Sequence, residues 1–166
     1  PVIGVRILGC GSSGGVPRAD GDWGACDPKN PKNYRLRCSL LVERAATLDA
    51  LRAGHATRRL IDTSPDLRQQ LLAAGSPMLD GVAFTHIHAD QSHGIDDVRA
   101  VVYRKRAKLP AFAGPRTAAG LTLRFDYIFQ TPTGSGYPPL MDLASLDPGA
   151  EATVDGPGGA LGFSLF

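Results

Sequence analysis

The chain has 166 residues, of which 43% are hydrophobic, and its 18 basic and 16 acidic side chains give a formal net charge of +2. This predicts one domain over residues 1–166 with its own core, and the small charge and lack of long apolar runs argue against long nucleic acid and membranes as partners. The sequence does not decide whether the protein forms a homo-oligomer. The three cysteines, Cys10, Cys26 and Cys38, are widely spaced, which predicts reduced thiols and a cytoplasmic protein.

Strands and helices are expected to alternate along the chain. The first segment, residues 2–9, alternates and is rich in β-branched residues, which is typical of a strand. Residues 63–66 combine a possible cap with a proline, so they predict a helix start, and Gly75 predicts its end. Strands are expected at residues 2–9, 39–43, 59–62, 81–85, 111–113, 152–154 and 161–166. Helices are expected at residues 67–74 and 115–125, a loop followed by a helix within 90–106, and a short helix within 45–57. Long loops are expected at residues 10–37 and 131–139. This mixture predicts an α/β layered fold.

Three of the four histidines lie within eight residues, in Thr85-His86-Ile87-His88-Ala89-Asp90-Gln91-Ser92-His93. Imidazole and carboxylate groups are good ligands for zinc and similar divalent ions. Side chains two residues apart on a strand point the same way, so His86 and His88 are expected to meet at one ion. Asp90 continues this alternation and is expected to reach a second ion. The segment therefore predicts metal-dependent hydrolysis.

This segment resembles the signature Thr-His-x-His-x-Asp-His-x-x-Gly of the metallo-β-lactamase superfamily, with Thr85, His86, His88, Asp90 and Gly94 in register. The resemblance implies an αββα sandwich with mixed β-sheets. It also implies two divalent metal ions, zinc first, with His86 and His88 binding one ion and Asp90 binding the other. Asp90 would also act catalytically, by orienting the nucleophile.

The chain departs from the signature at Gln91, which stands where the family normally has histidine. His93 lies two residues further on, and it either supplies the missing imidazole as a metal ligand or contacts a ligand or the substrate. Gln91 would support the site and make its second position richer in oxygen, so Mn²⁺ or Fe²⁺ is an alternative to zinc. The family also places an aspartate at the preceding strand end. Asp62 would there hold a ligand histidine in its correct tautomer, unless it caps a helix or forms an ion pair.

The first loop carries a second resemblance. Residues 8–18, Leu-Gly-Cys-Gly-Ser-Ser-Gly-Gly-Val-Pro-Arg, are similar to the first loop of the tRNase Z and cyclic phosphodiesterase branch, whose members act on phosphodiesters. Backbone N–H groups at Ser12, Ser13 and Gly14 could bind a phosphate, or the segment is a tight turn between strands. In the later Gly- and Pro-rich loop, Tyr137 could stack on a base or ribose, or pack within a rigid loop.

Together these features predict a phosphodiesterase that acts on a cyclic phosphate or nucleotide-like phosphodiester through a metal-bound hydroxide. Two alternatives stay open: a hydrolase of thioesters or lactones on the same scaffold, and a non-catalytic module that binds a nucleotide or a partner. In the family, the third histidine of the first metal, a bridging aspartate and a last histidine come from later strands, whereas no histidine follows His93 here. The chain also ends in an apolar, strand-like run. We therefore expect an N-terminal portion of a longer enzyme, incomplete after Phe166.

Overall fold

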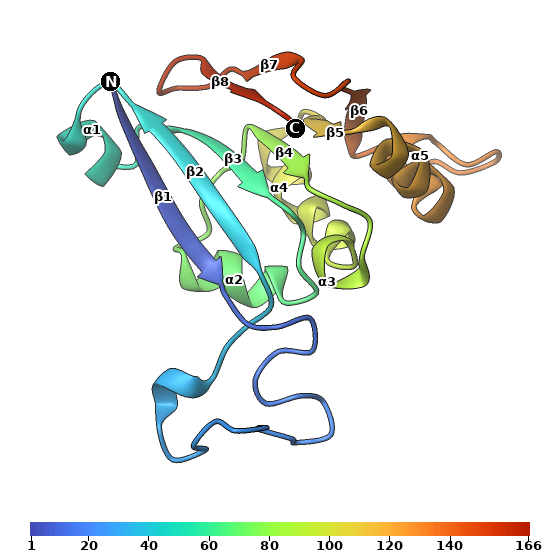
Figure 1. Ribbon diagram of the computed structural model, residues 1–166. Coiled ribbons are helices and arrows are strands. Elements are labelled where there is room, and N and C mark those ends of the chain that lie inside the picture. The colour runs from blue at the N-terminus through green and yellow to red at the C-terminus, as the bar shows by residue number, and fades with distance from the viewer.

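The structure, a computed structural model, describes all 166 residues and is built on a six-stranded mixed sheet (Figure 1). The strands lie side by side in chain order. The pairs β1–β2 and β2–β3 are antiparallel, and the pairs from β3 to β6 are parallel. The bounds are β1 Val2–Gly9, β2 Ser39–Ala45, β3 Thr57–Ile61, β4 Gly81–Phe84, β5 Leu109–Ala113 and β6 Met141–Ser145.

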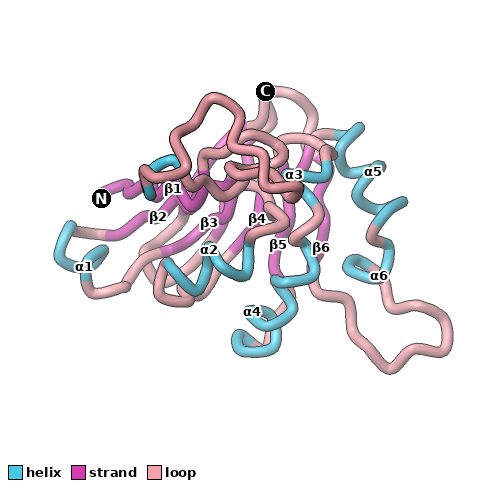
Figure 2. Tube along the Cα trace, turned by 90° about the horizontal axis from the view of Figure 1, so that it is seen from below, coloured by secondary structure: helices cyan, strands magenta, loops and turns pink.

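Helices provide the crossovers that parallel strands require. The bounds are α1 Leu48–Arg52, α2 Leu67–Ala73, α3 Ala89–Ser92, α4 Val98–Lys105, α5 Pro115–Arg124 and α6 Asp126–Phe129, with 3₁₀ turns at Pro31–Asn33 and Ile95–Asp97. Helices α2 and α4 lie on one face of the sheet (Figure 2). None of the helices is both long enough and apolar enough to span a bilayer.

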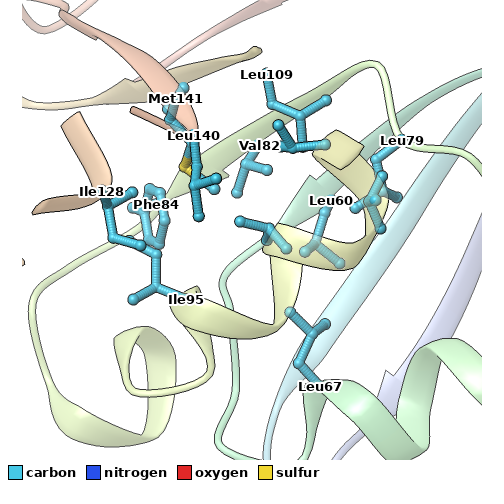
Figure 3. Close-up of a cluster of buried hydrophobic side chains, with 14 of the residues drawn as sticks. Leu60, Leu67, Leu79, Val82, Phe84, Ile95, Leu109, Ile128, Leu140 and Met141 are labelled. Atoms are coloured by element: carbon cyan, nitrogen blue, oxygen red, sulfur yellow. The ribbon is translucent and has the colours of Figure 1, made fainter. Parts of the chain in front are cut away.

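The main core fills the space between the sheet and these helices. It is one cluster of 19 buried residues, and Figure 3 shows Leu60 and Phe84 from the sheet packed with Leu67 of α2 and Ile128 of α6. This burial is the main source of stability, because apolar area removed from water contributes about 25 cal/mol per Å². The core thereby fixes the ends of β3 and β4, where the candidate site lies.

A hairpin covers part of the other face of the sheet. Its strands, β7 Glu151–Val154 and β8 Leu161–Ser164, are antiparallel. The Phe163 ring lies 5.1 Å from that of Phe112, centroid to centroid, and the Arg59 guanidinium lies 3.9 Å from the Phe163 centroid. The predicted α/β fold with a mixed sheet is confirmed, and the chain forms three layers of the expected αββα order: helices, the large sheet and the hairpin.

Two elements were not predicted from the sequence, β6 and α6. Strand β6 is the last strand of the sheet, and of its five residues only Met141 is buried. An edge strand with so little burial lacks the strong apolar alternation that marks β1. Its position comes from pairing with β5, from Leu109↔Met141 to Ala113↔Ser145. The other predicted strands and helices are found within a few residues of their expected bounds.

Candidate metal centre

The candidate site begins where β3 and β4 end, side by side. These strands are parallel, with Ile61 opposite Ala83, so Asp62 and Thr85 emerge at the same edge of the sheet. The Asp62 carboxylate accepts hydrogen bonds from the Thr85 N–H, at 2.8 Å, and from the Thr85 hydroxyl, at 2.7 Å. Asp62 has φ of 61°, a left-handed conformation that aspartate tolerates better than most residues. Asp62 therefore fixes the start of the histidine segment.

Asp62 is a buried carboxyl group, 6% exposed. Burial is the largest effect and raises the pKa of Asp62. The two hydrogen bonds from Thr85 and the charge of His86 lower the pKa, and the charge of Asp90 raises it, so that the net change is a rise. Ionised Asp62 therefore depends on hydrogen-bond donors and positive charge at the site.

The hydrogen bonds also determine which nitrogen of His86 is protonated. A hydroxyl has only one proton, and Thr85 donates it to Asp62. The 2.9 Å contact between Thr85 Oγ1 and His86 Nδ1 is then a bond in which Nδ1–H donates to the hydroxyl oxygen. His86 Nε2 therefore carries a lone pair, which accepts a hydrogen bond from His88 Nδ1 at 3.1 Å and could instead bind a metal ion. Control of a histidine tautomer by Asp62 stays a prediction, and the hydrogen bonds show that it would act through Thr85, which the sequence had not indicated.

His86 and His88 are brought together as a pair. His86 Nε2 lies 3.1 Å from His88 Nδ1, and both residues are exposed. Two nitrogens bound to one tetrahedral ion, with bonds of about 2.0–2.1 Å, lie about 3.3 Å apart. The geometry of the pair therefore fits two ligands of a single divalent ion.

Asp90 and Gln91 form a second polar unit, on helix α3. Gln91 is 8% exposed, and its side-chain Nε2 donates to Asp90 Oδ2 at 2.9 Å. Gln91 Oε1 is buried and has no hydrogen-bond partner. Buried acceptors are normally paired, so this oxygen beside a carboxylate is free to accept a donor or a cation that prefers oxygen. Gln91 thus forms a hydrogen bond with Asp90, and its support of a metal site stays a prediction.

His93 points to a different neighbourhood. Its exposed ring packs edge-on against Phe125, with centroids 5.6 Å apart, and its Nδ1 lies 3.3 Å from Ser92 Oγ. The structure brings together no group of three or more His, Cys, Asp or Glu side chains that could hold an ion. Of the four predicted ligands, His86 and His88 are therefore brought together, whereas Asp90 and His93 do not join them in such a group.

Gly94 of the signature has a packing role. A Cβ atom at Gly94 would lie 1.8 Å from the backbone oxygen of Ser64. The Gly94 N–H donates to Thr63 O at 2.9 Å, and the Thr63 N–H donates to Gln91 O at 2.8 Å. Only glycine permits this close approach, which attaches α3 to the β3–α2 turn.

The first loop projects from the same end of the sheet as α3 (Figure 1). Ser12, Ser13 and Gly14 are exposed, and no hydrogen bond joins them to the histidine segment. The neighbouring glycines permit close packing of the backbone, since a Cβ at Gly9 would lie 2.1 Å from Arg37 O. These observations show close backbone packing where the loop begins and leave phosphate binding a prediction.

Tyr137 lies apart from the histidines. It is 70% exposed and borders a hollow of about 390 Å³ with Arg99, Tyr103 and Tyr127. None of the histidines lines this hollow. Contact between Tyr137 and a substrate therefore stays a prediction.

Comparisons with known proteins agree on the fold. The family model for the beta-lactamase superfamily domain matches residues 57–164. The structure is similar to the crystal structure of a new diphosphatase from the PhnP family, with a TM-score of 0.67 and 28% identity over 92% of this chain and 57% of that chain. It is also similar to zinc-bound PqqB from Methylobacterium extorquens, with a TM-score of 0.60 and 18% identity over 91% of this chain and 48% of that chain.

A curated relative, an octanoyltransferase of Porphyromonas gingivalis, is 35% identical over 144 residues, which are 86% of this chain and 26% of that protein. The chain thus spans about a quarter of this relative and 57% of the diphosphatase. The family match covers more than half of the chain, from β3 to β8, and includes Asp62 and the whole histidine segment. The chain therefore belongs to the beta-lactamase superfamily and has the metallo-β-lactamase fold.

Proposed function

We propose that this domain hydrolyses small phosphodiesters, such as a cyclic phosphate or a nucleotide-like diester, with the help of divalent metal ions. The observation that carries the proposal is the His86–His88 pair, whose facing nitrogens lie 3.1 Å apart at the end of β4. The 28% identity to a diphosphatase of the PhnP family supports phosphorus chemistry. The formal charge of +2 suits a small anionic substrate.

Bound divalent ions would lower the pKa of a water molecule and stabilise the charge that develops on phosphate oxygens. His86 and His88 would hold one ion, with zinc the first candidate for an imidazole pair. Asp90, oriented by Gln91, would orient the nucleophile, and the free Gln91 oxygen would make Mn²⁺ or Fe²⁺ an alternative second ion. His93 would either bind a metal ion or contact the substrate. The N–H groups of residues 12–14 would bind phosphate oxygens.

Hydrolysis of bis(4-nitrophenyl) phosphate by the chain loaded with zinc or manganese tests the proposal. We expect His88→Ala to abolish both metal binding and hydrolysis. His55→Ala is the matched control, because His55 is exposed and precedes β3, at the end of the sheet opposite the histidine pair. Equal activity of the His88→Ala variant would refute the proposal. Metal binding by the wild type without any turnover would leave a non-catalytic binding module.

Thioester hydrolysis is the second candidate function. The observation in its favour is the 35% identity to an octanoyltransferase. The match covers 26% of that protein, so its name need not describe the matching part, and we place this candidate second. An octanoyl thioester assayed beside the phosphodiester separates the two, because metal- and His88-dependent cleavage of the thioester alone would favour acyl chemistry.

A further inference from the structure

A hollow of about 420 Å³ lies between helices α2 and α4, which cover the same face of the sheet (Figure 2). The helix residues that line it recur at spacings of three or four, the spacing that gives one face of a helix. They include Arg68, Leu71 and Leu72 in α2, and Ala100, Val101 and Arg104 in α4. The hollow is therefore a groove between two facing helix stripes, and no residue of the histidine segment lines it.

Apolar side chains form the floor of this groove. Leu71 and Val101 are buried members of the main core, and Leu72 beside them is 55% exposed. A ligand that covers this apolar surface would gain about 25 cal/mol for each Å² removed from water. No aromatic ring lines the groove, so it lacks the stacking surface that a nucleobase prefers. Its lining suits an aliphatic chain.

Two arginines border the groove, and neither is neutralised by a carboxylate. Arg68 and Arg104 are exposed and form no ion pair. Arg104 Nη2 donates a hydrogen bond to Ser76 O at 2.8 Å, which holds this guanidinium beside the end of α2. Asp97 is the one acidic residue of the lining, so two positive charges and one negative charge leave a formal charge of +1. This charge is complementary to an anion.

We propose that this groove binds a small amphipathic anion, an aliphatic chain that ends in a single carboxylate. The chain covers Leu71, Leu72 and Val101, and the carboxylate accepts charge-assisted hydrogen bonds from Arg68 and Arg104, whose planar guanidinium groups match its geometry. The volume of about 420 Å³ lies within the range of about 300–1,000 Å³ typical of small-molecule sites. The groove is a binding site separate from the proposed hydrolase centre, and its test does not require turnover.

The test titrates the full chain with sodium decanoate, below its critical micelle concentration, in a calorimeter. We expect saturable binding of one decanoate per chain. Amide ¹H–¹⁵N spectra recorded along the titration locate the site, and the largest shifts are expected in α2 and α4. Decyltrimethylammonium has the same chain with the opposite charge, and we expect no saturable binding of this cation in the groove.

Matched variants separate the charge from the apolar floor. Arg68→Gln and Arg104→Gln should each weaken decanoate binding about tenfold, because each removes a charge-assisted hydrogen bond. Leu72→Gln should weaken it several-fold. Arg116→Gln is the control, because Arg116 is also an exposed helix arginine without an ion pair but lies on α5, outside the groove. Arg68→Gln is the cleaner of the two arginine variants, since Arg104 also bonds to the Ser76 backbone.

Three results would overturn the proposal. The first is the absence of saturable decanoate binding to the wild type. The second is binding that is equal in the wild type and in Arg68→Gln, or that shifts amides outside α2 and α4 instead. The third is equal binding of decyltrimethylammonium, which would show that the arginines do not select the ligand.

Discussion

Replacing Asp62 by asparagine is expected to reverse the hydrogen-bond chain that runs through Thr85 to His86. The Asp62 carboxylate now accepts from both the Thr85 N–H and the Thr85 hydroxyl. In Asp62→Asn the amide oxygen can keep the N–H, but the amide nitrogen can only donate to the hydroxyl. The hydroxyl then donates to His86 Nδ1, and the ring carries its proton on Nε2. The nitrogen that faces His88 at 3.1 Å thereby loses its lone pair.

The expected loss of zinc affinity follows from this change of tautomer. Partners that orient a metal-binding histidine typically change affinity by about 10–100-fold when they are mutated, which is about 1.4–2.7 kcal/mol. The free energy of unfolding should change less. Removing the buried charge of Asp62 relieves a cost that its raised pKa reveals, while the weakened bonds to Thr85 cost about 1–2 kcal/mol. Metal affinity is therefore the sensitive readout.

Long-range ¹H–¹⁵N NMR of the metal-free protein measures the tautomer, and competition with a chromophoric chelator measures zinc affinity. We expect Nδ1–H at His86 in the wild type and Nε2–H in Asp62→Asn. Thr85→Ser is the control, because it keeps the hydroxyl and should behave as the wild type. Nδ1–H at His86 and unchanged zinc affinity in Asp62→Asn would refute the reasoning.

Three further predictions concern stability. Gly94→Ala should lower the free energy of unfolding by about 3 kcal/mol, because its Cβ meets the Ser64 backbone; urea titration should show no such loss for Gly136→Ala, where a Cβ meets open space. Asp66, whose pKa is lowered chiefly by hydrogen bonds from Arg37, should contribute about 1–2 kcal/mol above its unfolded pKa of about 3.9. This contribution disappears as the pH falls through the lower pKa of the folded state. If Asp66→Asn lowered the free energy of unfolding by the same amount from pH 7 to about pH 2, the prediction would be wrong. Zinc at 100 times its Kd should stabilise the wild type by about 2.7 kcal/mol and raise its Tm by several degrees, as measured by calorimetry. An equal rise of the Tm in His88→Ala would count against zinc binding by the histidine pair.

The sequence predicts best what strand periodicity controls. Residues 81–85 are a short apolar run, and the period of two places His86 and His88 on one side, so their meeting at 3.1 Å could be expected. Strand β6 could not be predicted, because pairing with β5 rather than burial of its own side chains defines it. The orientation of His93 toward Phe125 depends on how α5 and α6 pack, which no local pattern encodes.

Some residues of the signature hold the backbone of the site in place, in a frame around the proposed metal ligands. Thr85 connects Asp62 to His86, because its hydroxyl donates a hydrogen bond to Asp62 and contacts His86 Nδ1. Gly94 is needed because the backbone of Ser64 leaves no room for a Cβ. Gln91, which replaces the histidine of the signature, is part of this frame. Its backbone oxygen accepts a hydrogen bond from the Thr63 N–H, and its side-chain nitrogen donates one to Asp90. In the proposed two-metal site, Gln91 would present an amide oxygen to the second ion where the signature has an imidazole nitrogen, and His86 and His88 would still hold the first ion. A site built this way can change its metal preference without changing its fold.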